Sequence, residues 1–316
     1  MLDLAIIIVN YNTCALLRDC LASVFACKGD FSYRVCVVDN ASSDGSADMV
    51  RREFPQVDLI ASPVNGGYPY GNNVGLRHVG FQDEVPGDAR AAPRFVLLLN
   101  PDTIVPPTAL ADMLAFCETQ PNCGVAGPKL LRPDGSLDMA CRRSFPTPTV
   151  SFYRMIGLSK LFPRSPVFGR YNLTYLSPDV VTELDSVVGA FMLVRGAAIA
   201  QVGLLDETFF MYGEDLDWAY RIKQAGWKVW YNPAVTVLHY KEASSQHSDK
   251  ARYEFYRAMA IFYRKHYAAQ TAWPMHILVL GGITLRGALA MAGRRFRAWR
   301  QRRPQAARVS EQAGVS

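Results

Sequence analysis

The sequence predicts an α/β fold in which helices flank a mostly parallel sheet, followed by a membrane-associated apolar and basic helix. Three observations support this. Short apolar runs alternate with helical patterns, polar residues follow several of these runs, and an apolar stretch precedes an arginine cluster near the end. The 316 residues are 50% hydrophobic and 20% charged, so the chain can bury a full core. Disordered and collagen-like classes are excluded.

The first half predicts successive strand and helix units. Buried strands are expected at 4–9, 34–38, 57–61, 95–99 and 123–131, and helices at 13–26 and 46–54. A glycine-rich segment at 65–73 is expected to open another helix. The N-terminal run is too short to span a membrane and carries an acid where signal peptides have basic residues. We therefore interpret it as a strand of a cytosolic protein.

The second half has more varied patterns. We expect a long loop at 132–148, an amphipathic helix at 151–162, a strand at 187–194, a helix at 214–225 and short strands at 228–231 and 235–238. The apolar stretch 273–292 contains Arg286, which favours a helix lying in the membrane plane. A membrane span and a helix packed against protein remain alternatives.

The net charge of +6 originates in the tail. Residues 286–316 hold eight arginines and one acid, whereas residues 1–285 have a net charge of −1. Because residues 1–285 are nearly neutral, they give no reason to expect a polyanionic partner. A basic tail is typical of proteins that bind nucleic acid or an anionic membrane. Because an apolar stretch precedes the tail, we expect an anionic inner-membrane surface and no nucleic acid.

Polar residues follow three predicted strands, where ligands bind in parallel sheets. Asp102 can ligate magnesium or manganese (Mg2+ or Mn2+) while diphosphate oxygens complete the shell, and Asp39 can accept hydrogen bonds from a base or sugar. Asn10, Tyr11 and Asn12 can line the same pocket. Structural alternatives stay open: a helix cap for Asp102 or Asn12 and a turn for Asp39.

The segment 206–218 is the strongest local signal, with three acids in four residues beside aromatic side chains. The helix dipole stabilises acids in a first turn, which is the structural alternative. One of these acids can instead be a general base for a hydroxyl, and Trp218 can face a sugar ring. His239 is either a core imidazole or, with Asp102, part of an incomplete cation shell.

The loop at 65–73 matches neither the dinucleotide pattern G-x-G-x-x-G nor the phosphate-binding pattern G-x-x-x-x-G-K. A Rossmann dehydrogenase and a P-loop kinase are therefore disfavoured. Its glycines still allow backbone to approach a ligand.

Six segments together resemble family 2 glycosyltransferases of GT-A fold, in the rhamnosyltransferase-like branch. They occur in the family's order: IVNYN at 8–12, VVDNASSDGS at 37–46, NGGYPYGNNVG at 65–75, LNPD at 99–102, GAFMLVR at 189–195 and FMYGEDLDW at 210–218. The resemblance implies a GT-A domain at 1–245, with a nucleotide-sugar half at 1–131 and an acceptor half at 132–245. Residues 246–316 are the membrane-associating region.

The resemblance also implies residue roles. Asp215 is the expected catalytic base, with Glu214 beside it, and Asp102 and His239 are the expected metal ligands. Nucleotide-sugar contacts are expected from Tyr11, Asn12, Asp39, Asn65, Gly71, Asn72, Asn100 and Asp102. Acceptor contacts are expected from Gly189, Ala190, Tyr212, Trp218, Arg142 and Arg143. For the two arginines the reason is chemical, since a guanidinium fork suits the oxygens of the acceptor diphosphate, and ordinary surface arginines are the alternative. Asn100 stands where many relatives carry the first acid of Asp-x-Asp, so one carboxylate is missing.

The implied reaction is transfer with inversion from a nucleoside-diphosphate sugar, dTDP-rhamnose favoured, to a polyprenyl-diphosphate-linked saccharide. It is expected at the cytoplasmic face of the inner membrane, in cell-surface polysaccharide synthesis. A nucleotidyltransferase is one alternative, although no basic residue precedes Arg18 to grip phosphate. A non-catalytic sugar- or lipid-binding protein is another, and the presence of Asp102 and Asp215 argues against it.

Overall fold

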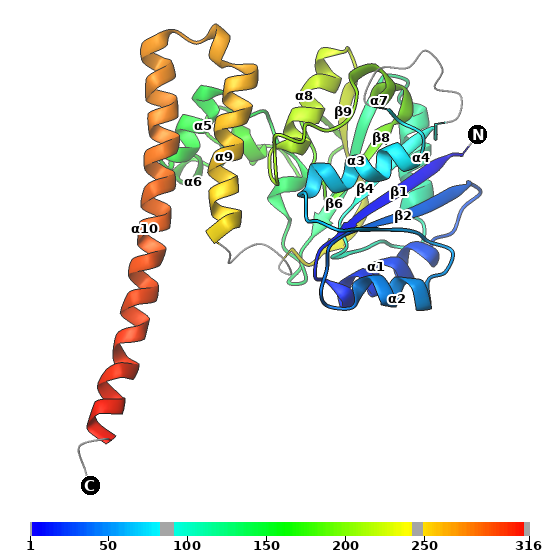
Figure 1. The fold of residues 1–316 in the computed structure, drawn as a ribbon. Helices are drawn as coiled ribbons and strands as arrows, with labels where there is room; N and C mark the ends of the chain where they lie inside the picture. The colour runs from blue at the N-terminus through cyan, green and yellow to red at the C-terminus, as the bar shows by residue number, and fades with distance from the viewer. Residues whose placement is uncertain (1, 83–91, 242–248, 313–316) are drawn as a thin grey trace. The chain divides into compact units, whose positions relative to one another are not determined.

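The computed structural model describes residues 2–82, 92–241 and 249–312, with side chains up to residue 293. The chain divides into two compact units, residues 1–245 and 246–316 (Figure 1).

One mixed sheet forms the centre of the first unit. Its order is β3-β2-β1-β4-β8-β6-β9-β5, and β7 pairs with β9. The strands are β1 (Leu4–Asn10), β2 (Tyr33–Asn40), β3 (Asp58–Ser62), β4 (Phe95–Leu99), β5 (Thr103–Ile104), β6 (Cys123–Leu131), β7 (Thr182–Leu184), β8 (Phe191–Arg195) and β9 (Lys228–His239). The first four strands in this order are parallel, and β8 runs antiparallel to β4 and β6. The predicted mostly parallel sheet is confirmed.

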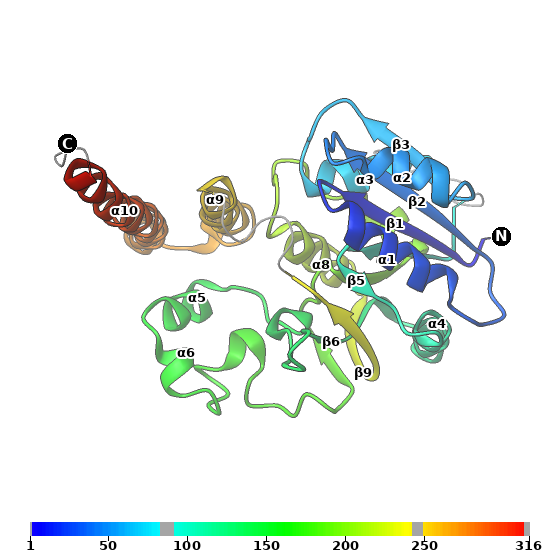
Figure 2. The same cartoon turned by 90° about the horizontal axis from the view of Figure 1, so that it is seen from below.

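Helices cover both faces of this sheet. The covering helices are α1 (Cys14–Phe25), α2 (Ser46–Glu53), α3 (Tyr68–His78), α4 (Ala109–Thr119), α7 (Gly196–Val202) and α8 (Glu214–Gln224). Two further helices, α5 (Pro148–Met155) and α6 (Leu158–Leu161), pack on each other beside the sheet (Figure 2). In Figures 1 and 2, α3 lies on one face of β1 and β2, and α1 and α2 lie on the other. This double cover explains why Leu4 to Ile8 are completely buried.

The structure differs from the expected elements at several places. The helix expected at 151–162 is split into α5 and α6, because Gly157 adopts φ +87° between them. The two strands expected at 228–238 are one strand, which pairs with β6 across an irregularity in register. The strand expected from 187 begins at Phe191, and α4 and α7 were not predicted.

The second unit contains α9 (Asp249–His266) and α10 (Trp273–Gln312). The two helices pack antiparallel: the Tyr263 hydroxyl lies 3.2 Å from His276 Nδ1, and Arg252 donates to the Ala290 carbonyl. The stretch Trp273–Gly293 is long and apolar enough to cross a membrane, and 11% of it is buried. The arginine side chains from residue 294 onward lie outside the described residues.

Candidate active site

Strand pairing brings Asp102 and His239 together. β5 runs antiparallel to β9 with Thr103 opposite His239, and the Tyr240 amide donates to the Asp102 carbonyl at 2.9 Å. Asp102 Oδ1 lies 3.4 Å from His239 Nε2, which is long for a hydrogen bond. This oxygen is buried and has no hydrogen-bond partner. A buried carboxylate oxygen without a partner is costly unless a cation or another ligand approaches it.

Asp138 holds the other side of the imidazole, a role that the sequence analysis missed. Its carboxylate is fully buried, lies 3.0 Å from His239 Nδ1 and is also paired with Lys241. Burial opposes ionisation of Asp138, but bonds from His239 and Lys241 outweigh it and lower its pKa. Burial also opposes the charge on His239, yet Asp102 and Asp138 raise its pKa to about 9. A carboxylate on Nδ1 fixes the orientation in which Nε2 faces Asp102.

This donor set fits a divalent cation. Asp102 offers an unpartnered oxygen, and Asp138 supports the His239 ring at Nδ1. Because the pKa of His239 is about 9, a bound cation would displace the proton from Nε2 for that nitrogen to act as a ligand. Over residues 2–82, 92–241 and 249–293, no group of three or more acidic, histidine or cysteine side chains could hold a metal. Diphosphate oxygens or water would therefore supply the remaining ligands, as Mg2+ commonly requires.

The acidic pair lies at the start of α8. Tyr212 and Gly213 have φ of +67° and +82°, so two consecutive left-handed residues turn the chain into the helix. Asp215 Oδ2 accepts bonds from Arg143 Nη2 at 2.6 Å and from the Gly189 amide at 3.1 Å. Both charged side chains are about nine-tenths buried, at 10% and 8% exposure. Tyr212 is not a glycine, so its left-handed backbone conformation is strained, and backbone strain of this kind is concentrated at functional sites.

Glu214 has the opposite environment. It is 6% exposed, and its Oε2 has no hydrogen-bond partner. Burial, followed by the neighbouring Asp215 charge, raises the pKa of Glu214 to about 8. Two adjacent buried carboxylates resist joint ionisation, and Arg143 compensates the charge of only one. At neutral pH, Glu214 is therefore protonated, whereas Asp215 is the acid that pairs with Arg143.

Replacing Glu214 with Gln is expected to stabilise the protein more at high pH than at low pH. The folded-state pKa of Glu214 lies above its ordinary value of 4.5, so the folded state binds the extra proton and stability falls as pH rises from 4.5 to about 8. The glutamine variant lacks this loss. The difference in melting temperature between the variant and wild type should be several degrees larger at pH 8.5 than at pH 5, in favour of the variant. Asp48→Asn, at an exposed site on α2, is the control. An equal difference at both pH values would refute this assignment of protons.

A short backbone segment joins the two halves of the site. The Gly189 amide contacts Asp215, its carbonyl accepts the Tyr68 hydroxyl at 2.8 Å, and the next carbonyl, of Ala190, accepts the Asn100 amide. Burial raises the pKa of Tyr68, and the charges of Glu214, Asp215 and Asp102 raise it further. Tyr68 thus lies close enough to both the acid pair and Asp102 to be affected by their charges.

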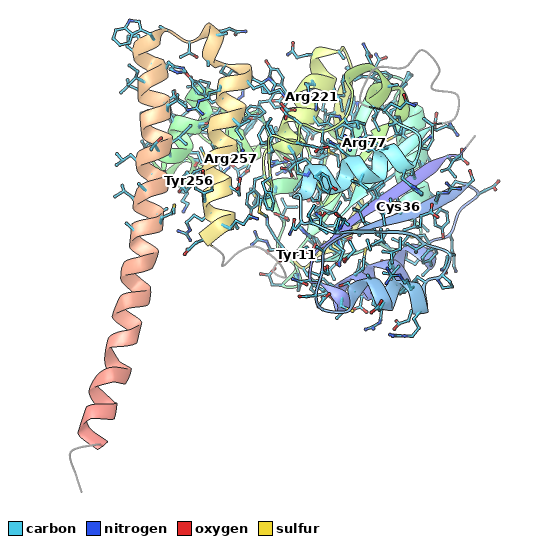
Figure 3. The ribbon with its side chains drawn as sticks, viewed as in Figure 1. Tyr11, Cys36, Arg77, Arg221, Tyr256 and Arg257 are labelled. Carbon is cyan, nitrogen blue, oxygen red and sulfur yellow. The ribbon has the colours of Figure 1, made fainter. Side chains whose placement is uncertain are left out.

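The expected nucleoside residues form a compact loop. Asp39 is 2% exposed, and its oxygens accept bonds from Asn10 Nδ2 at 2.8 Å and from the Ser42 amide at 2.9 Å. Asn12 accepts from the Ser43 amide and does not cap α1. Tyr11 is 42% exposed at the end of β1 (Figure 3). The structure thus shows the turn-stabilising role of Asp39, and its contact with a nucleoside stays a prediction.

The glycine-rich loop is held to the acidic segment. Asn65 accepts the Gly67 amide, and the Tyr68 amide donates to the Phe210 carbonyl at 2.8 Å. Asn72 is 1% exposed, with an unpartnered Oδ1. At Gly71 a Cβ would lie 2.6 Å from a Val9 methyl carbon, so this glycine lets α3 pack on β1. The expected contact of Gly71 with a nucleotide sugar stays a prediction.

A family model described as glycosyltransferase like family 2 matches residues 3–256. The chain belongs to this glycosyltransferase family. The predicted family and enzyme class are therefore confirmed, and glycosyl transfer replaces the nucleotidyltransferase and non-catalytic alternatives.

The glycosyltransferase is similar to characterised relatives over most of its length. An N-acetylglucosaminyl-diphospho-decaprenol L-rhamnosyltransferase of Mycobacterium tuberculosis is 29% identical over 90% of this chain and 92% of its own. The low-salt glycan biosynthesis hexosyltransferase Agl10 of Haloferax volcanii is 27% identical over 85% of this chain and 76% of its own. Rhamnosyltransferase WbbL of Escherichia coli is 28% identical over 67% of this chain and 74% of its own.

Solved structures support the fold. A mannosyltransferase from Pyrobaculum calidifontis, PcManGT, superposes with a TM-score of 0.53 at 18% identity, over 99% of this chain and 79% of its own. TarS of S. aureus gives a TM-score of 0.52 at 16% identity, over 90% of this chain and 43% of its own. Together with the family assignment, these superpositions confirm the GT-A prediction.

Several acceptor contacts expected of the glycosyltransferase are contradicted. Trp218 is fully buried and donates to the Gly203 carbonyl at 2.9 Å, because it occupies the inward face of α8 and cannot stack on a sugar. Arg142 is 2% exposed and donates to the carbonyls of Leu176 and Ser177, so it cannot meet a diphosphate. Ala190 is part of the core.

Two further residues have roles that were not expected. Arg143 Nη2 donates to Asp215 and to the Val187 carbonyl, so this arginine holds the acid pair, and its expected diphosphate contact stays a prediction. Gly189 uses both of its backbone polar groups within the protein and forms part of the site's wall. Tyr212 is half-buried before the acid pair, and its acceptor contact stays a prediction.

Proposed function

We propose that this glycosyltransferase moves a sugar, rhamnose favoured, from a nucleoside-diphosphate donor, dTDP-rhamnose favoured, to a polyprenyl-diphosphate-linked saccharide with inversion. The observation that carries the proposal is the junction at Gly189 and Ala190. It connects the arginine-paired Asp215 to the strand end that bears Asp102 and His239. Similarity to the decaprenol-linked rhamnosyltransferase along 90% of the chain supports this donor and acceptor class.

The residues suggest a single displacement. Asp215 accepts the proton of the acceptor hydroxyl as its oxygen bonds to the anomeric carbon, and the bond from that carbon to the nucleoside diphosphate breaks on the opposite face. One bond forms and one breaks, so the configuration inverts without a covalent sugar intermediate. Arg143 pairs with Asp215 at 2.6 Å and holds its carboxylate in place. Glu214, protonated at neutral pH, does not add a second negative charge beside it.

Asp102 and His239 would hold Mg2+ or Mn2+, which offsets negative charge on the leaving diphosphate. Asn100 adds no charge to this shell, and its backbone N–H donates to the Ala190 carbonyl. We expect Asp102→Ala to weaken Mn2+ binding in the presence of nucleoside diphosphate about 10-fold or more, measured by electron paramagnetic resonance. Asp112→Ala, at an exposed site on α4, should bind as wild type does. Full transfer activity in excess chelator would contradict a required metal.

A donor screen tests the proposed reaction. Purified full-length protein is given a short-chain polyprenyl-diphosphate saccharide and each of several nucleotide sugars, with dTDP-rhamnose among them. Transfer from dTDP-rhamnose with an inverted anomeric configuration, determined by nuclear magnetic resonance, is the expected result. Retention of configuration would overturn the mechanism, and transfer only from another sugar would overturn the donor assignment.

We further propose that the enzyme works at the cytoplasmic face of the inner membrane, with α10 lying in the membrane plane. Trp273, Leu278 and Leu285 are 74%, 67% and 62% exposed, and such apolar surface is stabilised within lipid. A lipid-linked acceptor stays in the same plane, so anchoring raises its effective concentration at the enzyme.

A further inference from the structure

Residues 148–172 form a second amphipathic surface, in the unit that carries the active site. This surface, which we call the α5–α6 patch, comprises α5, α6 and the chain up to Asn172. Five large apolar side chains on it are about half exposed or more: Phe152, Ile156, Leu161, Phe162 and Val167. Exposed apolar clusters of this kind mark interaction sites on soluble proteins.

The charges of the α5–α6 patch all have one sign. Arg154, Lys160, Arg164 and Arg170 are exposed among the apolar residues. No acid occurs between Asp138 and Asp179, a length of 40 residues that includes the whole patch. A surface that combines exposed apolar groups with cations alone complements an anionic lipid surface. Two copies of the patch would repel each other, which disfavours self-association.

The patch is an ordered element and not a frayed helix end. The Tyr153 and Phe168 rings meet edge to face at 4.9 Å, and Phe162 lies 5.6 Å from Phe168. The Arg154 guanidinium lies 4.1 Å above the Tyr171 ring. These inner aromatic contacts hold α5 and α6 in a hairpin around Gly157, while Leu161 is 69% exposed.

The patch is connected directly to the acid pair. The residues that lead into α5 include Arg143, which binds Asp215, and Phe145, whose ring lies 4.9 Å from Tyr220 on α8. The Phe145 amide is also held by the Asp185 carboxylate at 3.0 Å. Contact of the patch with a membrane would therefore hold the acid pair close to the lipid surface.

We propose that the α5–α6 patch docks the catalytic unit on anionic lipid, independently of α10, and so presents the site to its lipid-linked acceptor. The docking is inferred from the exposed apolar and basic side chains of the α5–α6 patch alone, whereas its role in acceptor delivery rests on the proposed function. Figure 2 shows α2 beside β3, on the opposite side of this unit from α5 and α6, so α2 provides a control position.

The docking is tested by placing an environment-sensitive fluorophore on full-length Leu161→Cys, with Arg51→Cys on α2 as the control. Labelled wild type gives the background from native cysteines. In vesicles containing phosphatidylglycerol, emission at position 161 should shift to the blue, while position 51 should not change. Vesicles of phosphatidylcholine alone should produce a smaller shift. Vesicle-bound protein with no shift at 161 would overturn the proposal and would favour a protein partner.

A kinetic experiment tests acceptor delivery. A double variant, Lys160→Glu with Arg164→Glu, should raise the KM for a long-chain polyprenyl acceptor in anionic vesicles about 10-fold. The reason is that each basic residue near an anionic membrane strengthens the attraction of the protein to it. The KM for a short-chain acceptor in solution should not change, which also shows that the variant is folded. An equal rise for both acceptors would refute delivery by the patch. A blue shift at 161 without any rhamnosyl transfer would refute the proposed function and leave the docking intact.

Discussion

Asp215→Asn is expected to reduce transfer about 10²- to 10⁴-fold while sugar-nucleotide binding stays unchanged. The amide can still accept the bonds from Arg143 and the Gly189 amide, but it cannot take a proton from the acceptor hydroxyl. The rate of the chemical step, measured in a single turnover, should carry the whole effect. The donor dissociation constant, measured by calorimetry, should equal that of wild type.

Glu214→Gln separates the two acids of the pair. Because Glu214 is protonated near pH 7, its neutral analogue should lose far less activity than Asp215→Asn. If the glutamine variant were inactive and the asparagine variant active, the base would be Glu214. Near wild-type transfer by Asp215→Asn would remove that residue from the chemistry.

Arg143→Met is expected to lower the melting temperature by about 10 °C, because it leaves a buried carboxylate without its partner. Removing one partner of a buried ion pair lowers the free energy of unfolding by about 4 kcal/mol. In a chain of this size, each kcal/mol of lost stability lowers the melting temperature by a few degrees. The 2.6 Å contact with Asp215 lies in a part of the structure where both side chains are nearly inaccessible. Scanning calorimetry at pH 7 measures the change.

Arg142→Met is the matched control for this experiment. Arg142 is equally buried but donates to the carbonyls of Leu176 and Ser177 instead of to an acid. Adding Asp215→Asn should therefore recover part of the stability lost in Arg143→Met and none of that lost in Arg142→Met. Equal recovery in both backgrounds would show that the ion pair has no special energetic role.

The sequence predicted the strand ends well because apolar runs and the polar residues after them are local features. Asp102 and His239 were expected together, and the pairing of β5 with β9 places them 3.4 Å apart. Asp138 was missed because it lies in a segment without periodicity. The turn at Asp134 to Ser136, closed by the bridge between Leu131 and Leu137, was the available signal that the chain returns to the sheet.

The acceptor side was harder to predict because burial there depends on tertiary packing. Trp218 and Arg142 have side-chain types that often bind sugars and phosphates, yet both are inaccessible. Nothing local in the sequence shows that the Trp218 side chain of α8 points into the core. Nor does it show that Arg142 donates to the carbonyls of Leu176 and Ser177, which lie 34 and 35 residues further along the chain. The chemistry that residue type suggests for Asp215 stays a prediction, and Arg143 is a partner that the sequence analysis did not expect.

The link between Tyr68 and Phe210 restricts how this enzyme can be re-engineered. The Tyr68 amide bonds the Phe210 carbonyl, and a side chain at Gly67 would come within 2.3 Å of that same oxygen. The two loops are 142 residues apart in the chain but share one tightly fitted contact. Grafting one loop from a homologue with a different donor preference would break that fit. Chimaeras should therefore exchange both loops as a single module.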